Sequence, residues 1–186
     1  MAETKNTSTA QATPNKGTKV SNPTVIIETN KGPMEAELWE DKAPISVKNF
    51  LSYVDDKFFD DTIFHRVIDG FMIQGGGMTA DMKEKQTKAP IKNEASSELK
   101  NLKGTLAMAR TNIVDSATSQ FFINTVDNDF LNHKGTGPQT FGYAVFGKIT
   151  KGLETLDVIS KVKTKDVGFH QNVPAEPVVI KSIRKK

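Results

Sequence analysis

Short apolar runs recur along this chain, and most of them are bounded by Gly, Asn, Asp or Pro. Runs of this length between turn-forming residues are typical of β-strands. They occupy residues 63–68, 71–74, 105–109, 120–124, 143–149 and 178–183. Strands and helices do not alternate, which argues against a doubly wound α/β fold. The pattern predicts a mainly β protein with an antiparallel sheet that closes into a barrel, because closure removes exposed edges.

A β-hairpin is predicted near the N-terminus, in "PTVIIETNKGPMEAELWE". Two β-rich runs flank Asn30-Lys31-Gly32, and Met34, Ala36 and Leu38 alternate with polar residues. Alternation with a period of two predicts that the second strand buries one face.

Helical spacing occurs in two places. Val47, Phe50, Leu51 and Val54 follow Pro44, a residue that the first helical turn tolerates. A second helix is predicted over residues 153–162, where apolar residues share one face. The segment 75–103 has little periodicity and is expected to form surface loops.

Residues 1–22 form a polar tail without hydrophobic periodicity, which is expected to be disordered. The tail carries about +2 of the formal net charge of +3, so the remainder has no concentrated basic face for nucleic acid. No run of eighteen apolar residues is present, so no membrane span is expected. The tail also lacks the apolar core of a signal peptide. Two interpretations stay open: a native cytoplasmic start at Met1, or a chain from which an upstream export signal was removed.

The chain has no cysteine and three histidines. The absence of cysteine excludes thiol nucleophiles, disulfides and zinc–thiolate sites. The histidines are far apart and lack the spacing of metal ligands, so no metal site is expected. A phosphate site at Gly75-Gly76-Gly77 is disfavoured, because no Gly-Lys-Ser/Thr sequence follows. The glycines are instead expected to permit a tight backbone path.

The stretch "FHRVIDGFMIQGGG" places Arg66 inside an apolar, strand-like run. Alternation puts Arg66 on the face opposite His65, together with Phe64 and Ile68. A guanidinium cannot act as a base, but it is a fixed donor of hydrogen bonds. Two interpretations remain at this point: a donor in a binding groove, or an arginine paired with an acid on the surface.

The stretch "SQFFINTVDNDFLN" is rich in aromatic residues. Adjacent strand residues face opposite sides, so we expect Phe121 in the core and Phe122 on the other face.

Several of these stretches together resemble the cyclophilin family of peptidyl-prolyl cis–trans isomerases, in its bacterial branch. "FHRVIDGFMIQGGG", "GTLAMART", "SQFFINT", "DFLN" and "FGYAVFGKITKGLETLDVI" occur in order between about Val25 and Ile183. The resemblance implies a closed, eight-stranded antiparallel β-barrel capped by two α-helices over residues 23–186. It also implies a groove for proline peptides on the outer surface of the barrel.

The resemblance assigns roles residue by residue. Arg66 matches the catalytic arginine and Gln74 its partner glutamine, whereas His65 matches a structural position. The walls of the proline pocket and the peptide-contacting positions match Phe71, Met72, Ala109, Arg110, Thr111, Gln120, Phe122, Phe130, Leu131 and Tyr143. The backbone of Arg110 is expected to bond the substrate chain.

Two positions differ from the eukaryotic pattern, which usually has tryptophan at Phe130 and histidine at Tyr143. Loss of the indole N–H removes a donor, so at most weak cyclosporin binding is expected. The family resemblance implies a monomer that needs no cofactor or metal and acts on proline-containing polypeptides, assisting protein folding. The alternative is a proline-peptide-binding chaperone or holdase without turnover. The closing stretch "KDVGFHQNVPAEPVVIKSI" resembles exported bacterial members and favours the periplasm over the cytoplasm.

Overall fold

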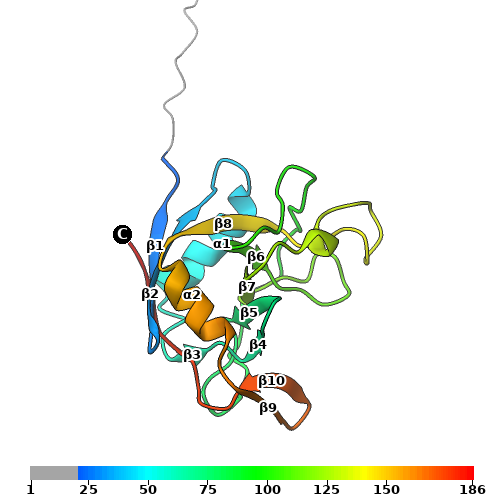
Figure 1. Cartoon of the computed structure of the whole chain (residues 1–186). Helices are drawn as coiled ribbons and strands as arrows, with labels where there is room; N and C mark the ends of the chain where they lie inside the picture. Colours follow the sequence, from blue (N-terminus) through cyan, green and yellow to red (C-terminus); the bar gives the residue numbers. More distant parts are fainter. Residues whose placement is uncertain (1–20) are drawn as a thin grey trace, which may run out of the picture.

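A curled antiparallel sheet dominates the computed structural model, which describes residues 21–186 (Figure 1). The predicted tail at residues 1–22 therefore lies almost entirely outside the described residues. The sheet has nine strands in the order β3-β11-β1-β2-β8-β6-β7-β5-β4. Its strands are β1 (Thr24–Thr29), β2 (Gly32–Leu38), β3 (Thr62–Ile63), β4 (Arg66–Ile68), β5 (Met72–Gly75), β6 (Thr105–Met108), β7 (Phe121–Asn124), β8 (Val145–Lys151) and β11 (Val179–Lys185).

The mainly β, antiparallel prediction is confirmed, but the expected closed eight-stranded barrel is wrong in strand number and closure. The ladder is open between β3 and β4, which stand at its two ends. The run 63–68 was expected to be one strand, and it breaks at Phe64 and His65 because its hydrogen bonds change partners there. The N–H of Ile63 bonds the carbonyl of Met78, and the N–H of Phe64 bonds that of Val178. Phe64 consequently enters the core instead of sharing the face of Arg66.

The predicted hairpin is formed by β1 and β2, and the alternation in β2 buries Met34, Ala36 and Leu38. The turn is held by Thr29, whose hydroxyl accepts the N–H of Lys31 at 3.0 Å and donates to the carbonyl of Gly32 at 2.6 Å. This side-chain bonding fixes the turn, and turn geometry helps to set the register of the two strands.

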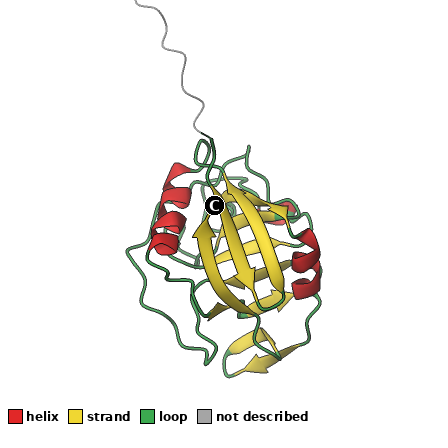
Figure 2. Ribbon diagram, turned by 90° about the vertical axis from the view of Figure 1, so that its left-hand side faces the viewer, coloured by secondary structure: helices red, strands yellow, loops and turns green. Residues whose placement is uncertain are grey.

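Both predicted helices are present, as α1 (Pro44–Asp55) and α2 (Leu153–Ser160). They lie on opposite sides of the curled sheet (Figure 2). Phe50 of α1 packs against Phe59, Phe121 and Phe146, with ring centroids 5.1, 5.3 and 5.2 Å away. The helix thus anchors an aromatic core beneath the central strands. Among the described helices, none is long and apolar enough to span a bilayer.

The segment 75–103 was expected to form surface loops; Gly75 still belongs to β5, and residues 76–103 contribute no strand to the sheet. Contacts with α1 fix the path of this segment. The carboxylate of Glu94 accepts the N–H groups of Ile45 at 3.0 Å and of Ser46 at 2.7 Å. The N–H of Lys88 bonds the hydroxyl of Tyr53 at 2.9 Å. Glu94 therefore satisfies donors at the helix N-terminus, where a negative charge is favourable.

A second, two-stranded sheet, β9 (Thr164–Val167) and β10 (His170–Pro174), was not expected from the sequence. Most residues of β9 are exposed, so the hairpin has no alternating apolar pattern to reveal it. It projects at the bottom of Figure 1, with Phe169 fully exposed in its turn.

Candidate functional site

A row of side chains crosses three neighbouring strands and forms the floor of the site. Arg66 on β4 pairs with Gln74 on β5, and Gln74 pairs with Phe122 on β7. The neighbouring Ile73 and Phe121 are fully buried in the core. This confirms the expected division of Phe121 and Phe122 between the two faces, which follows from the two-residue period of a strand.

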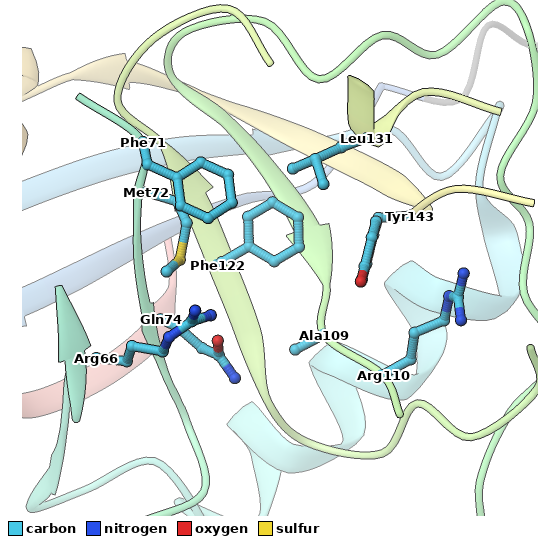
Figure 3. A pocket seen from close by; sticks show the side chains of 9 residues that line it. All are labelled: Arg66, Phe71, Met72, Gln74, Ala109, Arg110, Phe122, Leu131 and Tyr143. Atoms are coloured by element: carbon cyan, nitrogen blue, oxygen red, sulfur yellow. The ribbon is translucent and has the colours of Figure 1, made fainter. Parts of the chain in front are cut away.

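This row opens into a pocket of about 260 Å³ on the outside of the sheet (Figure 3). Its lining combines apolar walls with two guanidinium groups. The residues that line it are Arg66, Phe71, Met72, Gln74, Ala109, Arg110, Phe122, Leu131 and Tyr143. All nine were singled out from the sequence, and the fold brings them together from segments far apart in the chain.

The far wall of the pocket is built from η1 (Asp129–Leu131) and the segment before β8. The N–H of Tyr143 bonds the carbonyl of Leu131 at 3.1 Å, which holds the two wall residues together. The ring of Tyr143 meets that of Phe122 edge to face, with centroids 5.6 Å apart. Such aromatic contacts favour a fixed geometry, so the apolar cavity is largely preformed.

The remaining predicted site residues, Thr111, Gln120 and Phe130, do not line the pocket. Gln120 stands behind it, where its Oε1 accepts the amide N–H of Gln74 at 2.9 Å. Phe130 is 64% exposed, and its ring lies 5.5 Å from that of Phe71. The N–H of Thr111 bonds the hydroxyl of Ser116 at 2.9 Å, within an exposed loop. Gln120 and Phe130 thus support lining residues, whereas Thr111 lies outside the cavity.

The glycine run at the end of β5 leaves space for Gln120, which bonds Gln74. Gly76 has φ +88°, a left-handed conformation that favours glycine. A Cβ on Gly77 would lie 2.6 Å from Cγ of Gln120. A side chain at Gly77 would therefore displace Gln120 and, with it, the partner of Gln74. This agrees with the tight backbone path expected for these glycines.

Arg66 is one of the residues that line the pocket. It is half-buried, and among residues 21–186 no ion pair or side-chain hydrogen bond involves its guanidinium. The interpretation of Arg66 as half of a surface ion pair is therefore wrong. The neighbouring His65 is buried, and burial lowers its pKa to about 4. His65 is neutral at pH 7 and does not line the pocket.

Arg110 borders the pocket at the other end from Arg66 (Figure 3). Its Nε donates to the carbonyl of Gly142 at 3.0 Å, and its two Nη atoms donate to the carbonyls of Thr111 and Pro138 at 2.9 and 2.7 Å. Its guanidinium carbon lies 4.8 Å from the ring centre of Tyr143. In the described chain its own backbone N–H and carbonyl have no protein partner, so both remain available to a bound peptide.

A chain of buried asparagines, which no sequence pattern predicted, holds the pocket walls. The Nδ2 group of Asn128 donates to the carbonyl of Phe71 at 2.9 Å and to Oδ1 of Asn124 at 2.8 Å. Asn124 donates in turn to Asn101 at 3.2 Å, and the N–H of Asn101 bonds Oδ1 of Asn132 at 2.7 Å. Each amide is over nine-tenths buried, so its bonds strengthen in a low dielectric. The only sequence signal is a set of asparagines that otherwise resembles a loop.

Within the described part of the chain, no group of three or more His, Cys, Asp or Glu residues lies close enough to bind a metal ion. The polar groups that the pocket offers are guanidinium, amide and phenol donors and the carbonyls around them. These groups suit a neutral or negatively charged organic ligand such as a peptide segment.

Comparisons with known proteins agree with this site. The model of the "Cyclophilin type peptidyl-prolyl cis-trans isomerase/CLD" family matches residues 24–185. A "Peptidyl-prolyl cis-trans isomerase" of Acinetobacter baylyi is 58% identical over 167 residues, 90% of this chain and 87% of that protein. "Peptidyl-prolyl cis-trans isomerase B" of Escherichia coli is 55% identical over 159 residues, 86% of this chain and 97% of that protein.

Solved structures similar to this chain belong to the same family. A cyclophilin-type peptidyl-prolyl cis–trans isomerase of Cryptosporidium parvum matches with a TM-score of 0.74 and 29% identity, covering 89% of this chain and 98% of that one. The same protein in the presence of the dipeptide Ala-Pro matches with a TM-score of 0.73, 29% identity, and coverage of 88% and 98%. The sequence, the sheet and the family match agree, and the chain belongs to the cyclophilin-type peptidyl-prolyl cis–trans isomerases.

Proposed function

We propose that this chain accelerates rotation about X–Pro bonds in flexible polypeptides by non-covalent stabilisation of the twisted peptide bond, with Arg66 as the catalytic residue. The observation that carries the proposal is a guanidinium that lies beside an apolar pocket and has no ion-pair partner within residues 21–186. A carboxylate partner would have neutralised that charge and occupied its donors.

The chemistry requires a donor and no nucleophile. Amide resonance gives the peptide bond a rotational barrier of about 18–20 kcal/mol, and uncatalysed X–Pro exchange takes about 10–100 s. At the twisted transition state the prolyl nitrogen loses conjugation and regains a lone pair. A fixed cation that donates to this nitrogen binds the twisted state more tightly than either planar state, which lowers the barrier.

The other lining residues hold the substrate while it turns. The apolar walls around Phe122 and Met72 suit a proline ring, and the free backbone groups of Arg110 suit an extended peptide. The bond from Gln74 to Gln120 fixes the amide of Gln74 beside Arg66. Preformed geometry of this kind limits the entropy that binding must remove.

The test compares wild type with Arg66→Ala and Arg66→Lys. Exchange in an X–Pro peptide is measured by NMR line shape, and peptide binding by chemical-shift titration. Removing a transition-state donor typically costs about 10²–10³-fold in kcat, whereas ground-state binding should change by less than about threefold. The lysine variant should recover part of the rate, since it restores the charge but not the planar fork.

A proline-peptide-binding chaperone without turnover is the alternative, which the family match and the named isomerase relatives do not favour. It would bind the same peptide through the apolar pocket, with no need for an unpaired arginine. Binding by folded wild-type protein with no acceleration of exchange would favour this function. Equal losses of binding and rate in Arg66→Ala would contradict a transition-state role for the guanidinium.

Finer properties form part of the proposal. We propose a monomer that assists folding of client chains. We expect at most weak cyclosporin binding, because Phe130 has no N–H at the pocket rim. Sedimentation and inhibition by added cyclosporin measure the two properties. A stable dimer or tight inhibition would contradict them.

We also propose a periplasmic location, on the likeness of residues 165–183 to exported bacterial members. The experiment is cell fractionation of the native host with antibodies to the domain, with a cytoplasmic and a periplasmic marker run alongside. Recovery with the cytoplasmic marker would overturn this location.

A further inference from the structure

The pocket contains two positive charges and no negative one. Arg66 and Arg110 line it, and no Asp or Glu is among its lining residues. Neither arginine takes part in any ion pair of the described residues. A guanidinium stays protonated throughout the working pH range, so the site carries both charges permanently.

The charge of Arg110 is fixed in place without being neutralised. Its three hydrogen bonds go to backbone carbonyls, which are neutral acceptors, and its stacking on Tyr143 restricts its motion. Two acids occur in the segments next to this end of the pocket, Asp115 in a loop and Asp129 in η1, and each bonds an asparagine instead of Arg110. Asp115 accepts the N–H of Asn93 at 2.9 Å, and Asp129 accepts an amide N–H of Asn132 at 3.2 Å.

We propose that the site prefers X–Pro segments that carry an acidic side chain close to the proline, with Arg110 as the residue that determines this specificity. The inference rests on the proposed function, in which Arg66 is occupied by the prolyl unit. Figure 3 places Arg66 and Arg110 at opposite ends of the pocket, so the charge of Arg110 is left for a flanking residue. A Glu or Asp there gains an attractive charge, whereas a Lys or Arg meets a repulsive one.

The expected preference is moderate because the pocket is open to solvent. One exposed charge pair changes an equilibrium by up to about fivefold, so replacing Glu by Lys should change kcat/KM by about five- to tenfold. Salt screens exposed charges, with a Debye length near 10 Å at 0.1 M and about 3 Å at 1 M. The preference should therefore fall to about twofold or less at 1 M NaCl.

The experiment uses the full chain and a peptide series in which Glu, Gln or Lys stands in turn at each of the two positions before and after one proline. Exchange rates are measured by NMR at low and high salt. At one or more of these positions, the exchange rate should be highest for the Glu peptide, intermediate for Gln and lowest for Lys. The differences between these rates should become smaller at high salt. Equal rates for the three residues at all positions would overturn the proposal.

Variants assign the preference to Arg110. Arg110→Lys keeps the charge and should keep most of the discrimination between Glu and Lys peptides, whereas Arg110→Gln should reduce it to less than about twofold. Arg184→Gln removes a cation outside the pocket and should leave the preference unchanged. Full discrimination in Arg110→Gln would overturn the assignment. If both Arg110 variants fail to fold or to bind peptide, the wild-type protein still provides a test. A ratio of Glu to Lys rates that does not fall at 1 M NaCl would overturn the charge preference.

Failure of this proposal is distinct from failure of the proposed function. A wild-type protein that accelerates all peptides equally would keep its isomerase mechanism and lose only the charge preference. A protein that accelerates none of them, including the Gln peptides, would contradict the mechanism itself.

Discussion

Acidification should destabilise this fold through one buried histidine. His65 is 6% exposed, and its Nδ1 has no hydrogen-bond partner among the described residues. Burial, followed by the charges of His170 and Arg66, lowers the pKa of His65 from 6.5 to about 4. A tenfold change in proton affinity corresponds to about 1.36 kcal/mol, so the difference amounts to about 3 kcal/mol.

The direction follows from which state binds the proton. Well above pH 6.5, His65 is neutral in the folded and the unfolded chain and contributes no pH dependence. As the pH falls from 6.5 towards 4, the unfolded chain binds a proton that the folded chain does not. The free energy of unfolding therefore decreases through this window. By the lower end, His65 alone should have removed most of the about 3 kcal/mol.

The measurement is urea unfolding at several pH values between about 7.5 and 4.5, for wild type and His65→Phe. The phenylalanine variant lacks the titrating group, so its free energy of unfolding should fall less over the same range, by about 2–3 kcal/mol. The comparison at pH 7.5, where His65 is neutral in both states, gives the effect of the substitution itself. Parallel pH profiles for wild type and His65→Phe would refute the argument that a buried neutral imidazole causes the loss.

Two further predictions concern the aromatic core and the pocket walls. Phe121→Ala should cost about 3–5 kcal/mol of unfolding free energy because the ring is fully buried in the aromatic core, whereas Phe122→Ala should mainly raise KM because that ring lines the pocket. Chemical denaturation and peptide kinetics separate these effects, and a larger stability loss in Phe122→Ala would contradict the assignment of faces. Asn128→Ala leaves the carbonyl of Phe71 and the amide of Asn124 without this partner, so stability should fall by about 1–3 kcal/mol and KM should rise. An unchanged KM in folded Asn128→Ala would show that the wall does not depend on this bond.

Much of the site follows from local sequence patterns. The short segment between Arg66 and Gln74 forms a tight turn between β4 and β5, so the two residues become cross-strand neighbours by local geometry. The separation of Phe121 and Phe122 follows from strand alternation alone. The remaining wall positions were predicted from the resemblance to bacterial cyclophilin motifs. These motifs contain all of the residues that line the pocket.

The structural features that were not predicted from the sequence depend on contacts between distant residues. The strand breaks at Phe64 because its N–H bonds the carbonyl of Val178. Val178 is far away in the sequence, so no local pattern predicts this bond. The bond between Asn124 and Asn101 joins residues 23 positions apart, and asparagines are common in loops for unrelated reasons. The β9–β10 hairpin has exposed, polar residues, so its sequence does not distinguish a strand from a loop. Burial and tertiary hydrogen bonding, rather than local propensity, determine these features.

The position of β11 has a consequence for how the chain is made. This last strand lies between β3 and β1, and its residues Ile180 and Ile183 are fully buried. During synthesis at about 5–20 residues per second, β1 pairs early with β2 but waits roughly 8–30 s for its other neighbour. For that interval the nascent chain exposes an unpaired strand edge next to unburied apolar side chains. The edge of β1 therefore gains its second partner only after the segment of β11 has left the ribosome.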